Sequence, residues 1–433
     1  MQMPVTENPA CLDVAIIGGG PAGISAGLEL SEHRSLRVAL FERDAQLGGM
    51  PRSCHYFFGM RDQKRVYTGP VYARELARKI RGTNVQIHTD AMVLNISPGN
   101  LETPHGFDVL SPEGLVSHQS RFIVLATGCC ERSRHSRMIP GSRPAGIYTT
   151  GTLQQLVNLN RMRFTGKRAV IIGSELVAFS SVLTLRHAGV SIAALVEQYA
   201  DIHSYGFLAE AMKRFYGFPI YRDTAVGDIL GNESVEGVEL LDIRTQQRVE
   251  VPCDMVIITG RFRPESSLID HTLIERDAST DGPAVDMDLL TSVPNIYAAG
   301  NVLRGADMHD LCALEGRLVA RQIMKQRAAP AYGNTEWVSL QAEPPIRYVV
   351  PQKVSPGKIR RGYLGGLFPG PAFQVALTLR KAVVEAVSGT ERLWQCFYRK
   401  LIANNRYPLP IEKFAWHRLN QERRIVLRLR SFT

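Results

Sequence analysis

DVAIIGGGPAGISAGLELSEHRSLRVALFERD, which covers residues 13–44, is the stretch that decides the fold. An apolar run ends at Gly18-x-Gly20-x-x-Gly23, a small-residue helical pattern follows, and a second apolar run ends at Glu42. In such a strand–helix–strand unit the glycines permit a tight turn, a close backbone approach to a pyrophosphate, and close helix packing. The helix N-terminus offers free N–H groups to phosphates, and Glu42 can accept hydrogen bonds from ribose hydroxyls. The stretch therefore predicts a dinucleotide-binding unit.

Downstream motifs indicate that this dinucleotide is FAD. Gly48-Gly49 follows soon after the unit, FIVLATG closes a first section, and a later strand reaches Gly300-Asn301 shortly before a helix that begins around residues 309–311. In two-dinucleotide flavoproteins these places approach the flavin, hold its ribityl chain and aim a positive helix end at its pyrimidine edge. The predicted FAD-binding residues are Gly18, Gly20, Pro21, Ala22, Gly23, Glu42, Arg43, Gly48, Gly49, Val93, Ala126, Thr127, Gly128, Gly300, Asn301, His309 and Asp310.

A second unit of the same order lies between the two FAD sections, at about residues 148–263. Its turn, VIIGSELVAFS, has Gly173 in the first glycine place and Glu175 where the second glycine would stand, and Glu197 ends the next strand. A carboxylate beside a pyrophosphate adds bulk and like-charge repulsion, whereas Glu197 suits an NAD ribose. Two interpretations remain open. Either the unit does not bind NAD(P) in the ordinary way, which we favour, or Glu175 turns outward and the pyrophosphate rests slightly displaced.

The seven cysteines argue against several kinds of redox site. None of them forms a C-x-x-C or C-x-x-x-x-C pair, which argues against a dithiol relay, and we predict no metal site. Cys54 and His55 follow Gly48-Gly49 and are candidates for a catalytic nucleophile or acid–base pair near the flavin. Because neighbours in sequence usually point apart, we favour a pocket wall or a subunit contact for these two residues.

The net charge of +10 is concentrated at the C-terminal end. From Pro344 onward seventeen Lys and Arg face four Asp and Glu, a balance of +13, so the rest of the chain carries −3. Alternating apolar residues at 373–379, near 394–398 and in RRIVLRLRSF predict a small basic β-rich module. Its basic face suits docking of an acidic partner or peripheral contact with an anionic membrane. No nucleic-acid motif is present, so we expect no nucleic-acid partner.

The predicted fold class is α/β, with two Rossmann-like dinucleotide-binding domains and the small C-terminal module. We place the first part of the FAD-binding domain at residues 1–147, an inserted NAD(P)-like domain at 148–263, the second part of the FAD-binding domain at 264–330, and the module at 331–433. No apolar run is long enough to span a membrane and no signal-peptide pattern opens the chain, so we expect a cytoplasmic protein.

Four segments together resemble one branch of the pyridine nucleotide-disulfide oxidoreductase superfamily of FAD-dependent enzymes. They are GGMPRSCHYFFGMR, ATGCCERSRHSRMIPGSRPAGIYTTGTLQQLV, VIIGSELVAFSSVLTLRHAG and AAGNVLRGADMHDLCALEGR. The branch includes the larger subunits of opine oxidase and hydrogen cyanide synthase, and the alpha subunits of dye-linked proline and hydroxyproline dehydrogenases. It also includes flavoproteins associated with glycerol-3-phosphate dehydrogenase.

The resemblance implies an electron-relaying flavoprotein subunit of a heteromeric dehydrogenase or oxidase. The substrate class would be a small amino acid, an opine or a hydroxy acid, oxidised at a second flavoprotein subunit. A separate small iron–sulfur subunit is a further expected partner, because the tail holds only Cys396. The alternatives are a stand-alone NADH-dependent flavin reductase and a nucleotide-loaded, non-catalytic scaffold for a catalytic partner.

Overall fold

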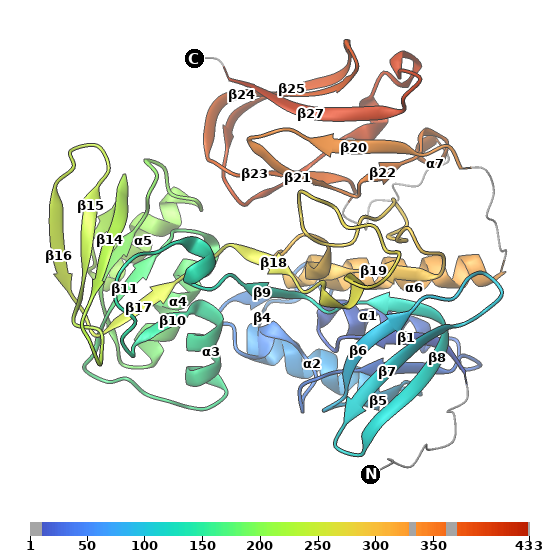
Figure 1. Ribbon diagram of the computed structural model, residues 1–433, viewed down its shortest axis with the longest axis horizontal. Coiled ribbons are helices and arrows are strands. Elements are labelled where there is room, and N and C mark those ends of the chain that lie inside the picture. The colour runs from blue at the N-terminus through green and yellow to red at the C-terminus, as the bar shows by residue number, and fades with distance from the viewer. Residues whose placement is uncertain (1–10, 329–334, 361–369, 432–433) are drawn as a thin grey trace.

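A computed structural model of the chain describes residues 11–328, 335–360 and 370–431. Figure 1 shows two sheets with flanking helices lying side by side, and a strand-rich C-terminal module above them. The paired strands β9 (Cys129–Glu131) and β18 (Phe262–Pro264) join the two sheets, since the chain leaves the first sheet along β9 and returns along β18. The predicted α/β class with two dinucleotide folds is confirmed.

The first sheet has seven strands. Their order is β5 (Gln86–His88), β2 (Val38–Phe41), β1 (Leu12–Ile17), β8 (Gly114–Leu125), β7 (His105–Ser111) and β6 (Met92–Ser97), with β19 (Ile296–Ala298) paired to β8. Strand β1 runs parallel to β2 and β8, and its nearly continuous apolar burial suits a strand covered on both faces. Because β19 lies in this sheet, a segment near residue 300 completes a fold that begins near residue 12.

Three helices belong to this first fold: α1 (Pro21–Leu30), α2 (Gly69–Arg81) and α6 (His309–Ala328). Helices α1 and α6 pack directly on each other, and a Cβ at Gly316 would lie 2.0 Å from the Ala22 carbonyl oxygen. Glycine at this position therefore lets α6 approach α1 closely. A short hairpin of β3 (Phe57–Phe58) and β4 (Tyr67–Thr68) leads into α2.

The second sheet is formed by the inserted segment. Its five parallel strands have the order β10 (Ile147–Thr149), β17 (Met255–Ile258), β11 (Arg168–Ile172), β12 (Ser191–Val196) and β13 (Ile220–Tyr221). The helices of this fold are α3 (Thr150–Asn158), α4 (Leu176–His187) and α5 (Gly206–Tyr216). An antiparallel sheet of β14 (Thr224–Leu230), β15 (Gly237–Asp242) and β16 (Arg248–Pro252) lies beside it. Over the described ranges, no helix is long and apolar enough to cross a membrane.

The C-terminal module is rich in β structure, as predicted. One sheet has the order β22 (Lys353–Val354), β20 (Val338–Ala342), β27 (Arg424–Ser431), β24 (Leu379–Ser388) and β25 (Glu391–Leu401). A second contains β21 (Ile346–Val350), β23 (Ala372–Val375) and β26 (Arg406–Pro408), and α7 (Pro356–Arg360) is a short helix. Phe373, Val384 and Leu427 belong to the shared apolar core, so the module has a core of its own.

A buried ion cluster fastens the module to the first fold. Arg406 Nη1 lies 3.1 Å from Asp307 Oδ2 and 3.4 Å from Glu315 Oε1. Arg304 completes the cluster, with Nε 2.9 Å from Asp307 and Nη2 2.5 Å from Glu315. Burial opposes ionisation of Asp307, but the charges of Arg304 and Arg406 hold its pKa at about 2. The module is therefore anchored by charges that face little water.

The contact between the module and the inserted fold is more exposed. Arg380 Nη2 lies 2.9 Å from Asp201 Oδ1, and the Arg380 side chain is 70% exposed. Ion pairs of this kind are screened by water and salt. The module thus contacts both folds, through buried ion pairs with the first fold and through an exposed ion pair with the second.

Part of the basic face of the module neutralises a buried carboxylate. Glu385 is only 1% exposed, and three arginines from β25 and β27 converge on it. Arg392 lies 3.4 Å from its Oε1, while Arg428 and Arg430 lie 3.1 and 3.0 Å from its Oε2. These guanidinium groups have an internal partner already.

Candidate functional site

The glycine turn of the first fold, residues 18–23, is here called the first turn, and that of the second fold, residues 173–178, the second turn. The first turn leaves open space where a pyrophosphate is expected. Gly18 has φ +111°, and a Cβ there would lie 2.3 Å from the Ala126 carbonyl oxygen, so only glycine suits this close approach of β1 and β8. Gly20 caps α1 in an extended conformation, and a Cβ on it would meet no atom within 4 Å. Pro21 and Ala22 open the helix, so its free N–H groups face the same space.

Glu42 stands at the end of β2, beside the turn. Its Oε2 accepts a hydrogen bond from Gly19 N at 2.7 Å, and its Oε1 accepts one from Asp44 N at 2.9 Å. Burial raises the pKa of Glu42, and these two N–H groups work against that rise. Ala91 N donates to the Glu42 carbonyl oxygen. Arg43, the residue after Glu42, is exposed. The predicted ribose acid is thus held in place by the backbone.

The Gly48-Gly49 pair packs against this turn. Gly48 N donates to the Gly19 carbonyl oxygen at 2.8 Å, and a Cβ on Gly49 would lie 3.0 Å from the Cα of Gly20. Val93, another predicted contact, is buried inside β6. The structure therefore brings the glycine pair to the first turn and places Val93 in the core.

The residues that follow β8 lie beside the first turn. Ala126 N donates to the Ile17 carbonyl oxygen at 2.8 Å, and Thr127 Oγ1 donates to the Glu265 carbonyl oxygen at 2.6 Å. A Cβ on Gly128 would meet no atom within 4 Å, as at Gly20. Both glycines thus border open space in the described structure.

Gly300 and Asn301 lie in a short 3-10 turn after β19. Gly300 N donates to Glu315 Oε2 at 3.0 Å. Asn301 Oδ1 accepts hydrogen bonds from Asp307 N at 2.9 Å and from Cys312 Sγ at 3.2 Å. Its side-chain oxygen therefore helps to shape the loop that leads into α6.

The first turn of α6 is held by neighbours from the β3–β4 region. His309 is buried with its ring centroid 4.7 Å from that of Phe58, and burial lowers its pKa to about 4. Asp310 accepts hydrogen bonds from Arg61 N and Nη1, both at 3.3 Å. His309 is therefore neutral at pH 7, and Asp310 is paired with Arg61.

The residues of the first fold fit a dinucleotide such as FAD. An added Cβ at Gly20 or at Gly128 would meet no atom within 4 Å, Gly20 caps α1, and Glu42 binds the turn through Gly19 N. A positive helix end and an acid for ribose hydroxyls are the two recognition elements that a dinucleotide needs.

In the second turn the corresponding space is filled by Glu175. Gly173 has φ +112°, so the tight turn itself is kept. A Cβ on Gly260, the counterpart of Gly128, would lie 2.1 Å from Glu175 Oε1. The Glu175 side chain therefore turns inward, and the outward orientation that would leave room for a displaced pyrophosphate is not adopted.

Glu175 shares a hydroxyl group with the backbone. Thr259 Oγ1 lies 2.9 Å from Glu175 Oε2 and 3.0 Å from the Ile172 carbonyl oxygen. The Thr259 hydroxyl is the donor to both oxygens, so it ties the Glu175 carboxyl group to the end of β11. Burial raises the pKa of Glu175, and the positive charge of Arg137 opposes that rise. The side chain that fills the second turn is therefore held in place by Thr259.

Glu197 holds the place in the second fold that Glu42 holds in the first. Its Oε2 accepts a hydrogen bond from Ser174 Oγ, and its Oε1 accepts one from Tyr199 N at 3.2 Å. Burial raises the pKa of Glu197. The second fold therefore keeps an acidic residue where ribose hydroxyls would bind, although Glu175 fills the place of the pyrophosphate.

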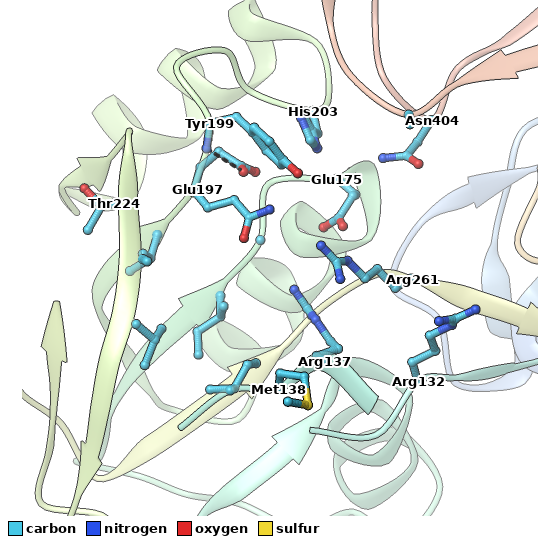
Figure 2. A pocket seen from close by; sticks show the side chains of 18 of the residues that line it. Arg132, Arg137, Met138, Glu175, Glu197, Tyr199, His203, Thr224, Arg261 and Asn404 are labelled. Atoms are coloured by element: carbon cyan, nitrogen blue, oxygen red, sulfur yellow. Dashed lines mark hydrogen bonds between the residues drawn. The ribbon is translucent and has the colours of Figure 1, made fainter. Parts of the chain in front are cut away.

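A cavity of about 450 Å³ opens in front of the second turn. Figure 2 shows Arg137 and Arg261 extending into it beside Glu175, with His203 and Asn404 on its other side. Arg132, Arg347 and part of the C-terminal module also line it. Sequence patterns do not identify these basic residues as part of a site, because they come from separate segments that only the fold brings together.

Cys54 and His55 contact the inserted fold separately. Cys54 Sγ lies 3.7 Å from Ser180 Oγ, and His55 Nδ1 lies 3.1 Å from Thr184 Oγ1, one turn further along α4. Burial raises the pKa of the Cys54 thiol to about 11, so it is protonated at neutral pH. His55 Nδ1 is also 3.2 Å from Asn158 Nδ2. The segment is therefore a contact between the two folds of the chain, and Cys54 and His55 have separate partners there.

Known proteins resemble this chain over its two dinucleotide folds. The family model for Pyridine nucleotide-disulphide oxidoreductase matches residues 12–329. Hydrogen cyanide synthase subunit HcnB of Pseudomonas protegens is 26% identical over 347 residues, which cover 73% of this chain and 71% of that protein. Ferredoxin–NADP reductase 1 of Lysinibacillus sphaericus is 24% identical, covering 67% of this chain and 82% of that protein. The crystal structure of L-proline dehydrogenase from P. horikoshii matches with a TM-score of 0.55 and 23% identity, covering 74% of this chain and 56% of that chain.

Proposed function

We propose a function from the premise that this chain belongs to the pyridine nucleotide-disulphide oxidoreductase family, a family of FAD-dependent oxidoreductases. The chain binds FAD in its first fold and is the electron-relaying subunit of a heteromeric dehydrogenase or oxidase. The complex acts on a small amino acid, an opine or a hydroxy acid, and oxidation of that substrate occurs at a second flavoprotein subunit.

The contrast between the two turns supports this proposal most directly. The space at Gly20 and Gly128 is open, whereas the space at Gly260 is filled by the Glu175 carboxyl group. A nicotinamide dinucleotide therefore lacks its usual phosphate place. No C-x-x-C or C-x-x-x-x-C pair is present either, so the chain has no dithiol of these types to exchange electrons with the flavin.

Several residues of this chain have a role around the cofactor. Bound FAD would supply hydride and single-electron chemistry, which no side chain here provides. Glu42 accepts hydrogen bonds from ribose hydroxyls, and the N-terminus of α1 stabilises the phosphates through its N–H groups. The first turn of α6 presents a positive helix end, with His309 kept neutral by burial.

The relatives support a multi-subunit enzyme. HcnB is by its name a subunit of hydrogen cyanide synthase, and the matched dehydrogenase structure is an L-proline dehydrogenase. A partner subunit and an iron–sulfur subunit follow for this chain only as part of the proposal. The module that spans both folds offers a surface for such a partner.

The test uses the chain with an affinity tag, expressed together with the genes that flank its own. We expect a second flavin-containing polypeptide to copurify in fixed proportion. In that complex an anaerobic addition of the correct substrate, chosen from proline, hydroxyproline, opines and hydroxy acids, bleaches both flavins. The isolated chain, loaded with FAD, serves as the control and keeps its oxidised spectrum with the same compounds. Reduction of the isolated chain by one of them at the rate of the complex would refute the subunit assignment.

A stand-alone NADH-dependent flavin reductase is the second candidate. Two observations favour it: Glu197 keeps its place at the end of β12, and a ferredoxin–NADP reductase is among the relatives. Fast bleaching of the isolated chain by NADH would select this candidate.

A further inference from the structure

The cavity in front of the second turn has an unusual charge arrangement. Four arginines line it, namely Arg132, Arg137, Arg261 and Arg347, against two carboxyl groups, those of Glu175 and Glu197. Arg132 and Arg137 follow β9, Arg261 directly precedes β18, and Arg347 belongs to the C-terminal module, so the four arginines lie outside the strand–turn–helix unit itself.

Within the described ranges, none of the four guanidinium groups has a carboxylate within ion-pair distance. Arg137 Nη1 donates to the Thr259 carbonyl oxygen, and Arg347 Nη1 donates to Gln374 Oε1 and Asn404 Oδ1, both at 3.1 Å. Burial lowers the pKa of both Arg137 and Arg347. Partly buried cations are costly unless an anion accompanies them, so the cavity favours an anionic ligand.

His203 gives a second, independent indication of a ligand. Its side chain is 7% exposed and lines the cavity, yet its Nε2 has no hydrogen-bond partner within the described structure. The ring is fixed by stacking on Tyr199 at 4.7 Å, and the backbone N–H donates to Ser174 Oγ at 2.9 Å. A buried ring nitrogen held in this way is expected to have a partner.

The donor geometry points to carboxylates. Phosphates of a dinucleotide use the N–H groups of a helix N-terminus, and the Glu175 side chain occupies that place in front of α4. The remaining donors are planar guanidinium forks, which bind carboxylates and phosphates in a bidentate way; with the helix N-terminus blocked for phosphates, we favour carboxylates. A cavity of about 450 Å³ is of the size that small molecules occupy.

We propose that this cavity binds a small organic acid with two or three carboxylate groups, held by Arg137, Arg261 and Arg347, with His203 Nε2 as a further partner. The site is independent of electron relay, and it lies between the inserted fold and the C-terminal module, because Asn404 and Arg347 of the module form one wall. A ligand here connects the two, so binding raises the thermal midpoint of unfolding.

The experiment uses the full chain loaded with FAD. Binding of citrate is measured by isothermal titration calorimetry at constant ionic strength, and thermal unfolding is then measured with and without citrate. Wild-type protein is expected to bind citrate with one site per chain and to melt at higher temperature with it. Arg261→Gln removes an exposed cavity arginine and should weaken binding by about tenfold, the typical value of one charge-assisted contact. Arg132→Gln provides a second variant at an exposed lining residue.

Arg263→Gln is the matched control. Arg263 lies two residues further along the same segment, is exposed, and does not line the cavity, so this variant should bind citrate like the wild type. Sulfate at equal ionic strength tests for non-specific anion binding. Equal stabilisation by sulfate, equal weakening in Arg263→Gln, or tighter binding of ADP or NADH than of citrate would each overturn the proposal. None of these measurements needs a partner or turnover, so the outcome is separate from that of the proposed function.

Discussion

The two dinucleotide folds have the same order of strand, glycine turn, helix and acidic residue, but their turns differ where a phosphate would approach. At Gly20 and Gly128 of the first fold, an added Cβ meets nothing within 4 Å. At Gly260 of the second fold, the same test meets the Glu175 carboxyl group at 2.1 Å. The acids that follow, Glu42 and Glu197, accept similar hydrogen bonds in both. One side chain therefore fills the phosphate place of the second fold while the architecture of that fold is retained.

The largest expected effect comes from placing the residue of the second turn in the first. Gly20→Glu should lower FAD affinity by about 100-fold or more, because a carboxylate would occupy the pyrophosphate space. The backbone at Gly20 is extended, so the new side chain causes no strain there. The ratio of flavin to protein absorbance after purification measures the loss. Gly206→Glu, at the start of α5 where a Cβ also meets nothing, should load FAD normally. Normal loading of Gly20→Glu would refute the assignment of the first turn.

A second comparison concerns how the C-terminal module holds each fold. Arg406→Met should cost about 3 kcal/mol of unfolding free energy, since it leaves Asp307 and Glu315 buried with one cation fewer. Arg380→Met breaks the exposed pair with Asp201 and should cost much less, because water and salt screen that pair. Urea unfolding of both variants measures the difference. Equal losses of unfolding free energy in the two variants would show that the module is not held more strongly to the first fold than to the second.

His309 provides a pH test of the first fold. Its folded pKa of about 4 lies below the ordinary value of 6.5, so the unfolded chain binds more protons between these limits. Its contribution to stability is therefore present above pH 6.5 and is lost as the pH falls toward 4. Between pH 7 and pH 5 the wild type should lose about 2 kcal/mol more than His309→Gln does, measured by urea unfolding at both pH values. Parallel losses in the two proteins would show that His309 is not buried neutral.

A smaller effect is expected from restoring glycine in the second turn. Glu175→Gly should increase NADH affinity by about tenfold, because it opens the space in front of α4. Glu175→Gln keeps the bulk without the charge and should resemble the wild type. Quenching of protein fluorescence by NADH measures both. An equal gain in Glu175→Gln would mean that charge, and not bulk, keeps the nucleotide away.

The sequence alone predicts the parts of this picture that depend on local spacing. The turn at Gly18 and Gly20, the strand ending in Glu42, and the helix that begins at His309 are all read from short motifs with a known backbone geometry. The question posed by Glu175 is also visible in the sequence. Its orientation is not, because that depends on contacts with Thr259 and Gly260, which lie more than eighty residues away.

Local sequence patterns cannot predict the basic cavity, for the same reason. Arg137, Arg261 and Arg347 meet only after the chain has crossed between the folds twice and the module has docked. Cys54 and His55 show the converse, because residues adjacent in sequence contact Ser180 and Thr184 separately. Alternation of side chains along an extended segment makes adjacency a poor guide to a catalytic pair.

An anaerobic titration of the isolated, FAD-loaded chain with NADH, followed by the visible absorbance of the flavin, tests most directly whether Glu175 keeps a nicotinamide dinucleotide out of the second fold. If Glu175 fills the phosphate place, the spectrum stays that of oxidised flavin over many minutes at excess NADH. Bleaching within the mixing time would contradict this account and would show that the second fold is a working nicotinamide site.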